Sequence, residues 1–307
     1  METCKRFRGA LLGLAAGDAV GTTVEFMPRG SFDRVTDMVG GGPFGLAVGQ
    51  WTDDTSMALC LAASLIETQG FDPRDQMRRY CDWHENGYMS STGICFDIGN
   101  TVRQALDRYR RTGEPFSGSS SPETAGNGSI MRLAPVPMFF YGRSADIVHY
   151  CAESSRTTHA TAECLDACRV FGQMISRALD GASKDQVLLG GEIDGITSPK
   201  IAAIARGEYR RKKSDEITGN GYVVNSLEAA LWCFSRGNSY EEAILRSANL
   251  GDDADTTAAI CGQLAGAHYG EDGIPERWRA KLTMRDRLID FADRLFEAGC
   301  GLTNACS

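Results

Sequence analysis

The sequence of 307 residues contains no apolar run of the roughly eighteen residues that a membrane-spanning helix needs. Basic residues are also fewer than acidic ones: the sequence has 32 Lys and Arg but 40 Asp and Glu, which gives a net charge of −8. Nucleic-acid-binding proteins carry a basic surface, so this balance argues against that class. Strand signals are few and isolated, at residues 193–196 and 222–224. We therefore expect no membrane span, no nucleic-acid partner and little β-structure.

The eleven cysteines follow neither a disulfide framework nor a zinc-binding pattern. No Cys-x-x-Cys pair occurs, and Cys164 and Cys168, four positions apart, are better explained by packing than by a soft metal. Other cysteines lie in apolar segments such as residues 59–61, which is typical of reduced, buried thiols. The basic N-terminus and the apolar residues 9–16 imitate a secretion signal, but Asp18 interrupts the run. We expect a cytoplasmic protein.

Most of the chain has helical periodicity or composition, and several helix starts are clearly marked. Proline at the first helical position follows Asp72, and Ser239 precedes two glutamates. Helices are expected at residues 5–16, 52–67, 72–85, 98–111, 128–140, 144–152, 158–180, 224–236, 239–248, 254–268 and 283–298.

Three glycine-rich loops interrupt these helices, at residues 40–50, 86–95 and 113–129. The last of them could be an interdomain linker. We interpret it as a loop within one domain, because two acidic clusters lie on either side of it and must come together. The predicted fold is therefore all-α, with a single compact multi-helix domain over residues 1–307.

The two acidic clusters each begin an apolar, alanine-rich helix. Residues 52–56 read Thr-Asp-Asp-Thr-Ser, and residues 252–257 read Asp-Asp-Ala-Asp-Thr-Thr. Helices that are apolar all round are buried, so their first turns are drawn inward. If the two starts meet, five carboxylates share one site: Asp53, Asp54, Asp252, Asp253 and Asp255.

Such a site needs positive charge. At ~4 Å and an effective dielectric near 20, each pair of like charges costs about 4 kcal/mol. Helix dipoles offset only about 0.3–1 kcal/mol per acid, and neither cluster contains Lys or Arg. Carboxylate and hydroxyl oxygens suit Mg²⁺, Mn²⁺ or Ca²⁺. The plainer alternative is that Thr52 and Asp252 are ordinary helix N-caps.

Other polar residues lie in less polar surroundings. The turn at residues 126–129, Gly-Asn-Gly-Ser, offers backbone N–H groups suited to an anion such as a phosphate. Glu25, Asp97 and His159 stand out in the same way, although each has an ordinary alternative as a cap, an exposed residue or a satisfied core group.

Together these segments resemble the ADP-ribosylglycohydrolase family. The matching motifs are specific and span residues 9 to 268 in the family's order. They are residues 13–19 with Glu25, 51–57, 96–101, 126–132, 159–160, 221–223 and 251–256.

The resemblance implies an all-α domain that binds two Mg²⁺ or Mn²⁺ ions and hydrolyses the bond between ADP-ribose and a protein side chain, often arginine. Asp252 would be a neighbour of the metal site. The ligands would be Thr52, Asp53, Asp54, Asp253, Asp255 and Thr256.

The same resemblance assigns the remaining roles. Glu25 and Asp97 are the candidates for the proton transfers of hydrolysis, with the two roles left unassigned between them. Asn127, Gly128 and Ser129 would hold the pyrophosphate. His159 and Tyr222 would line the ribose and adenine side, and Asn100 belongs to the substrate-binding residues through the motif at 96–101.

Several alternatives stay open. An isoprenoid-type synthase also pairs two aspartate clusters in an all-α fold, but it uses carboxylates one helical turn apart, a spacing that neither cluster has. A protein that only binds ADP-ribose, or has a structural role, would not need Asp97 and Glu25. Within the family, the substrate could be serine-linked or O-acetyl-ADP-ribose. An immunity protein that blocks an ADP-ribosylating toxin and reverses its modification is also possible, with contacts through residues 31–45 or the N-terminus.

Overall fold

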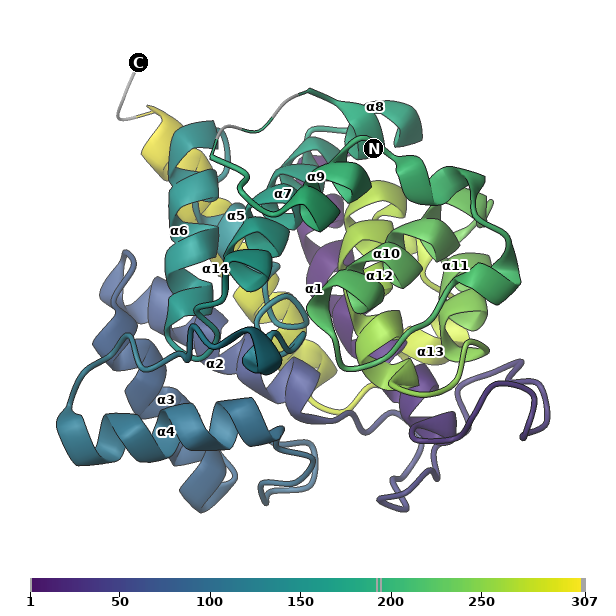
Figure 1. The fold of residues 1–307 in the computed structure, drawn as a ribbon, viewed down its shortest axis with the longest axis horizontal. Helices are drawn as coiled ribbons and strands as arrows, with labels where there is room; N and C mark the ends of the chain where they lie inside the picture. Colours follow the sequence, from purple (N-terminus) through teal and green to yellow (C-terminus); the bar gives the residue numbers. More distant parts are fainter. Residues whose placement is uncertain (1, 192, 194, 305–307) are drawn as a thin grey trace.

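Two buried helices that pack main chain against main chain form the centre of the protein. The computed structural model describes residues 2–191, 193 and 195–304. In it, helices α1 (Thr3–Gly21) and α12 (Ala254–Tyr269) lie together in the middle of the molecule (Figure 1). A Cβ placed on Gly13 would lie 2.4 Å from Gly262 O, and one on Gly17 would lie 2.2 Å from Ala258 O. Only glycine allows so close an approach, and the order of these contacts makes the two helices antiparallel.

A third buried helix, α2 (Asp53–Thr68), packs beside this pair. Its residues 53–65 are all buried, as are residues 254–267 of α12. The expectation that both acidic clusters begin fully buried helices is confirmed. Because α1 runs antiparallel to α12, the C-terminal end of α1 lies beside the start of α12, where the second cluster begins.

The other helices surround these three (Figure 1). They are α3 (Pro73–Asn86), α4 (Asn100–Thr112), α5 (Pro135–Phe139), α6 (Ser144–Arg156), α7 (Ala162–Leu179), α8 (Lys184–Leu189), α9 (Pro199–Ala205), α10 (Val223–Arg236), α11 (Tyr240–Ala248), α13 (Glu276–Arg279) and α14 (Arg285–Asn304).

The all-α single-domain prediction is confirmed, and the described residues contain isolated bridges but no β-strand. The strand signal at 222–224 belongs to the start of α10, and residues 192 and 194 of the other signal lie outside the described residues. None of the helices described in the structure is both long and apolar enough to cross a membrane.

One predicted helix, at residues 128–140, is wrong over most of its length. Only Pro135–Phe139 is helical, and residues 128–132 and 134 form turns. Proline lacks an N–H and is tolerated in the first turn of a helix, which is where Pro135 stands in this short segment. The short helices α8, α9 and α13 were not predicted, since four to seven residues are too few to show a period.

Candidate active site and metal centre

The starts of α2 and α12 meet at the C-terminal end of α1. The hydroxyl oxygen of Thr52 lies 3.0 Å from Asp18 Oδ1, 3.0 Å from Asp54 Oδ2 and 3.2 Å from Asp255 Oδ2. A hydroxyl has a single hydrogen, so it can donate to only one of these three carboxylates. Thr256 Oγ1 adds a contact of 3.3 Å to Asp54 Oδ2. The two acidic clusters therefore share one site, as the sequence predicted.

Asp18 was not among the predicted site residues, yet it fixes this junction. It is fully buried and accepts hydrogen bonds from the backbone N–H groups of Thr52 and Thr55, at 2.9 and 3.1 Å. The Thr55 hydroxyl also donates to Asp18 Oδ2 at 2.6 Å. Asp18 thus supplies the N-terminal cap of α2 from another helix, while the Thr52 side chain caps nothing. An acid inside the apolar first helix was the signal for it.

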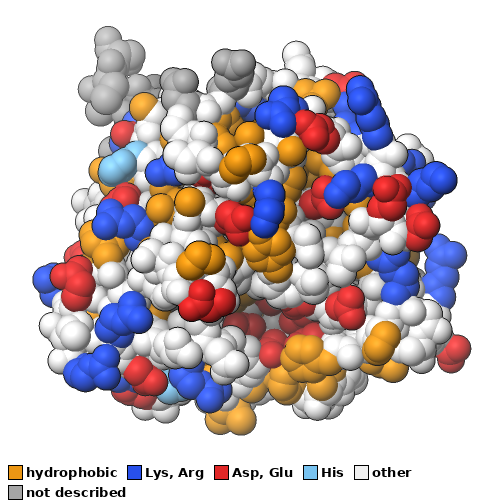
Figure 2. All heavy atoms as spheres, in the orientation of Figure 1, with side chains coloured by type: hydrophobic (Ala, Val, Ile, Leu, Met, Phe, Trp, Pro, Cys, Tyr) orange, Lys and Arg blue, Asp and Glu red, His pale blue; other side chains and the backbone are white. Residues whose placement is uncertain are grey.

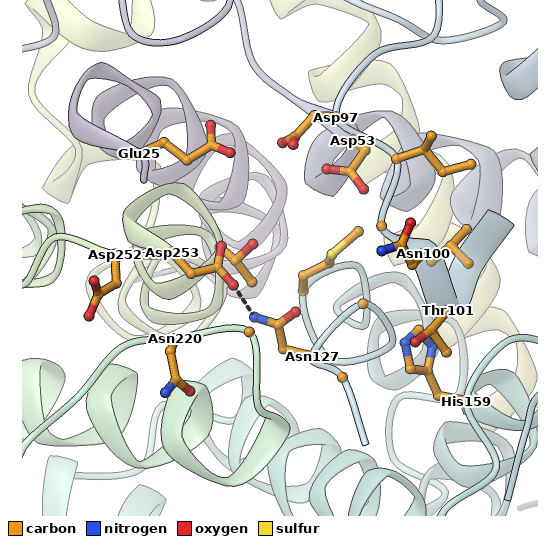
Figure 3. Close-up of a pocket in the computed structure, with 18 of the residues that line it drawn as sticks. Glu25, Asp53, Asp97, Asn100, Thr101, Asn127, His159, Asn220, Asp252 and Asp253 are labelled. Carbon is orange, nitrogen blue, oxygen red and sulfur yellow. Dashed lines mark hydrogen bonds between the residues drawn. The ribbon is translucent and has the colours of Figure 1, made fainter. Parts of the chain in front are cut away.

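The capping interpretation of the clusters is therefore wrong. The residue at the N-cap of α12 is Asp253, not Asp252, and its side chain makes no capping hydrogen bond either. Asp253 Oδ2 instead accepts a 2.7 Å hydrogen bond from the Asn127 side chain (Figure 3). These carboxylates face each other and the pocket rather than their own helices.

No cationic side chain balances this negative charge. Seven carboxylates gather here, and among the described residues none has a Lys, Arg or His nitrogen within 4.0 Å. They are Asp18, Glu25, Asp53, Asp54, Asp97, Asp253 and Asp255.

Burial first, and the neighbouring acids second, raise the pKa values of Asp53, Asp54 and Asp255 well above the ordinary range. The oxygens Asp54 Oδ1 and Asp255 Oδ1 are buried and have no hydrogen-bond partner. A buried carboxylate oxygen without a hydrogen-bond partner costs free energy. Carboxylate oxygens are the ligands that hard divalent cations prefer. The residues present therefore fit a metal site.

Two sets of three carboxylates bring their oxygens within 4.8 Å of one another, and both include Asp255. One adds Asp18 and Asp54, and the other adds Glu25 and Asp97. Asp255 thus connects the enclosed carboxylates Asp18 and Asp54 with Glu25 and Asp97, which line the pocket.

A pocket of about 770 Å³ opens above these carboxylates. Figure 2 shows it as a hollow with acidic side chains at its floor. In Figure 3, Glu25, Asp53 and Asp97 point toward one another at one end, whereas Asn100, Thr101 and His159 lie at the other. The volume suits a drug-sized or nucleotide-sized ligand.

Glu25 and Asp97 are the acids best placed to exchange protons with a ligand in this pocket. Burial, and next the charge of Asp97, raise the pKa of Glu25 to about 9. Burial, and next the charge of Asp253, raise the pKa of Asp97 to about 7. Asp97 has a left-handed backbone, with φ of 58°, a strained conformation for a non-glycine residue that is common at functional sites.

The far end of the pocket offers neutral donors. Helix α4 begins there at Asn100, directly after Gly99. The first N–H groups of a helix lack partners within it. The turn at residues 126–128 forms the adjoining wall, held by a hydrogen bond of 3.1 Å from Asn127 N to Gly221 O. An anionic group can bind to such N–H groups without a cation.

Most of the predicted site residues come together here, with two exceptions. Tyr222 contributes nothing to the pocket wall, because its hydroxyl donates to Glu163 Oε2 at 2.6 Å and accepts from Lys200 Nζ. Ser129 lies behind the wall, where its Oγ lies 2.9 Å from Ser155 Oγ. The wall also contains residues that the sequence did not single out: Phe26, Thr101, Met131 and Asn220.

The chain belongs to the ADP-ribosylglycohydrolase family, whose sequence profile matches residues 1–304. It is 43% identical to ADP-ribosylarginine hydrolase Tri1 of Serratia proteamaculans and 46% identical to Tri1 of Pseudomonas putida. Each alignment covers 96% of this chain, with 80% and 79% of the relatives.

More distant relatives and a solved structure agree with this assignment. The chain is 33% identical to ADP-ribosyl-[dinitrogen reductase] glycohydrolase of Rhodospirillum rubrum, over 91% of both proteins. A solved structure described as an ADP-ribosylglycohydrolase-related protein complex superposes with a TM-score of 0.84 and 40% identity, covering 97% of this chain and 99% of the other.

Proposed function

We propose that this protein, as one domain over residues 1–307, hydrolyses the N-glycosidic bond between ADP-ribose and an arginine side chain of a modified protein. The observation that carries the proposal is a cluster of seven carboxylates at and beneath one end of a single pocket, where Glu25 and Asp97 line the wall. The names of the two relatives at 43% and 46% identity support arginine as the linkage.

Two divalent cations, Mg²⁺ or Mn²⁺, fit this site as cofactors. The residues that would hold them are Thr52, Asp53, Asp54, Asp253, Asp255 and Thr256. When bound, such ions act as a template for ribose hydroxyls and water and as Lewis acids.

The residues of the chain account for the proton transfers. Hydrolysis forms a bond between a water oxygen and the anomeric carbon, breaks the bond from that carbon to the guanidine nitrogen, and moves one proton from water to the leaving nitrogen. Asp97 and Glu25 line the pocket, where they can exchange protons with a ligand and water. Without metal, burial and neighbouring acids raise the pKa of Asp97 to about 7 and that of Glu25 to about 9. The carboxylates beneath stabilise the positive charge that develops on the sugar.

The remaining assignments follow from the pocket. Asn100 and Gly128 line the end of the pocket proposed for the diphosphate, and His159 lies beside them. Asn127 lines it too, but its N–H donates to Gly221 O and its amide donates to Ser226 and Asp253, so we assign it to holding this wall in place. Tyr222 and Ser129, which hold other residues in place, support this wall from outside it.

The decisive experiment compares arginine-, serine- and glutamate-linked ADP-ribosyl proteins as substrates, with Mg²⁺, with Mn²⁺ and with EDTA. We expect release of ADP-ribose from the arginine-linked substrate only when metal is present. Activity confined to serine-linked or O-acetyl-ADP-ribose would make the linkage assignment wrong, and equal activity in EDTA would exclude the metal centre.

Three further predictions accompany this function. The first is a cytoplasmic location, supported by the buried thiols within the described residues, which form no disulfide. The second is the absence of a nucleic-acid partner, supported by the net charge of −8. The third, a direct complex with an ADP-ribosylating toxin, stays a prediction from the sequence, and co-purification with such a toxin would test it.

A further inference from the structure

A buried arginine without an acidic partner lies behind the neutral end of the pocket. Arg132 is completely buried, and among the described residues no carboxylate lies within 4.0 Å of its guanidinium. Its nitrogens donate to Gly128 O at 2.8 Å and to the hydroxyls of Thr157 and Thr158 at 3.3 and 2.7 Å. The Tyr80 ring covers one face, 4.7 Å from the guanidinium carbon. A buried charge that is held only by neutral groups is costly, so the contacts it makes call for an explanation.

The two threonine hydroxyls differ in what they do with their hydrogen. An arginine nitrogen can only donate, so both hydroxyl oxygens accept from Arg132. Thr157 then donates its hydrogen to Ser154 O at 2.7 Å. For Thr158, the remaining neighbour within the described residues is His159 Nδ1, at 2.9 Å.

This contact determines where the imidazole carries its proton. If Nδ1 were protonated, the buried Thr158 hydroxyl hydrogen would have no acceptor, which costs about as much as a lost hydrogen bond. If Nδ1 is unprotonated, Arg132 donates to the Thr158 hydroxyl and that hydroxyl donates to Nδ1, so the Thr158 hydrogen has an acceptor. Burial, and next the charge of Arg132, lower the pKa of His159 to about 3, so the ring is neutral and the proton lies on Nε2.

The Nε2 atom faces the pocket wall. A Cβ added to Gly126 would lie 3.2 Å from it, and one added to Gly128 would lie 3.3 Å from it. The His159 backbone is fixed by hydrogen bonds of 2.7 Å from its N to Ser155 O and 2.8 Å from Ser155 Oγ to its O. Figure 3 shows the ring beside Thr101 at the end of the pocket opposite the acids.

We propose that Arg132 and Thr158 are positioning residues that hold His159 in its Nε2-protonated form, so that Nε2–H donates a hydrogen bond to an oxygen of the bound ADP-ribose. This inference rests on the proposed function for the identity of the ligand. A diphosphate carries two negative charges, yet the pocket wall contains no Lys or Arg. Neutral N–H groups must therefore bind it, and a lone pair at Nε2 would repel it. Arg132 is permanently charged and lies two hydrogen bonds away from the His159 ring, through Thr158. It therefore fixes Nε2 as the donor without adding a cation to the pocket wall.

The tautomer can be observed directly in the Mg²⁺-loaded, ¹⁵N-labelled protein. The chain has only 4 histidines, so comparison with a His159→Gln variant assigns the ring signals. In two-bond ¹H–¹⁵N spectra we expect Nδ1 at the shift of an unprotonated nitrogen and Nε2 at that of a protonated one. The reverse pattern would overturn the proposal without any variant.

Variants then connect the tautomer to binding. Thr158→Val keeps the shape and removes the hydroxyl, so we expect both tautomers to appear and the Kd for ADP-ribose to rise about tenfold in calorimetry. Thr158→Ser should restore both readouts. The matched control is Thr157→Val, which removes the neighbouring contact to Arg132 and should leave the His159 spectrum and the Kd unchanged.

The outcomes separate the two hypotheses. An unchanged tautomer and Kd in Thr158→Val, or the same loss in Thr157→Val, would contradict the role of Thr158. If Thr158→Val does not fold, the wild-type spectrum still shows which tautomer His159 adopts, and Thr158→Ser still tests whether the hydroxyl is sufficient. Wild-type protein that fails to bind ADP-ribose would overturn the proposed function and this ligand together, whereas a reversed spectrum in protein that binds ADP-ribose overturns only the tautomer.

Discussion

Thr52 and Asp255 are 203 positions apart in the chain, and the hydroxyl of the first lies 3.2 Å from a carboxylate oxygen of the second. This contact joins the starts of α2 and α12, and with them the two acidic clusters. It places the proposed metal centre between segments that have no local reason to meet.

Removing a central carboxylate separates metal binding from folding. For Asp255→Asn we expect the Mg²⁺-dependent rise in Tm and the hydrolytic activity both to be lost. The metal-free variant should unfold with a free energy close to that of metal-free wild type, because burial already favours the uncharged form of Asp255 and the amide is uncharged as well. Thermal melts with Mg²⁺ and with EDTA measure this. Asp252→Asn, three positions away, is the control and should keep the metal response.

An acid at the pocket surface should affect turnover alone. Asp97→Asn removes a proton acceptor but none of the enclosed carboxylates, so we expect kcat to fall about 10²- to 10⁴-fold. The Mg²⁺-dependent rise in Tm should persist. Unchanged kcat in this variant would remove Asp97 from the proton transfers.

The metal-free protein should lose stability as pH rises. Folded-state pKa values of about 7 for Asp97 and about 9 for Glu25 lie above their ordinary values of 3.8 and 4.5. The native state therefore holds protons that the unfolded chain has released, and that stability, complete at low pH, is lost as pH rises through the folded pKa values. We expect a falling Tm between pH 7 and 9 in EDTA, above the range in which ordinary histidines titrate. Saturating Mg²⁺ should flatten the slope, and a Tm that rises with pH in EDTA would contradict this account.

A single methyl group between α1 and α12 should be strongly destabilising. The Cβ of Gly13→Ala would lie 2.4 Å from Gly262 O, so the helices must separate. We expect a loss of several kcal/mol in urea unfolding, as for other overpacked cores. Gly301→Ala in α14, where nothing lies within 4 Å of the added Cβ, is the control and should be neutral or slightly stabilising.

The sequence predicted the parts of the site that are marked locally. The acidic starts of α2 and α12 and the turn at residues 126–128 were all found, because charge against an apolar background is visible in the chain itself. Their convergence followed from burial, since two apolar helices must share one core. Tyr222 shows the limit, because the direction of its hydroxyl depends on Glu163 and Lys200, which no local pattern connects to it.

Asp18 shows a different limit. Its position in the apolar run was noticed only as evidence against a secretion signal, and its partners at Thr52 and Thr55 became evident only in three dimensions. Glycines at four-residue spacing in α1, at positions 9, 13, 17 and 21, predict a helix face that another backbone contacts, which is α12. They give no sign of α2, whose first N–H groups Asp18 caps.

The contact between α1 and α12 has a consequence for how the proposed metal centre tolerates substitution. Because the two backbones touch without intervening side chains, the offset between Asp18 and Asp255 depends on peptide geometry and not on how large residues interlock. Substitutions in the outer helices can therefore accumulate without altering the spacing of the ligands. Loss of one glycine in the contact would shift several acids at once.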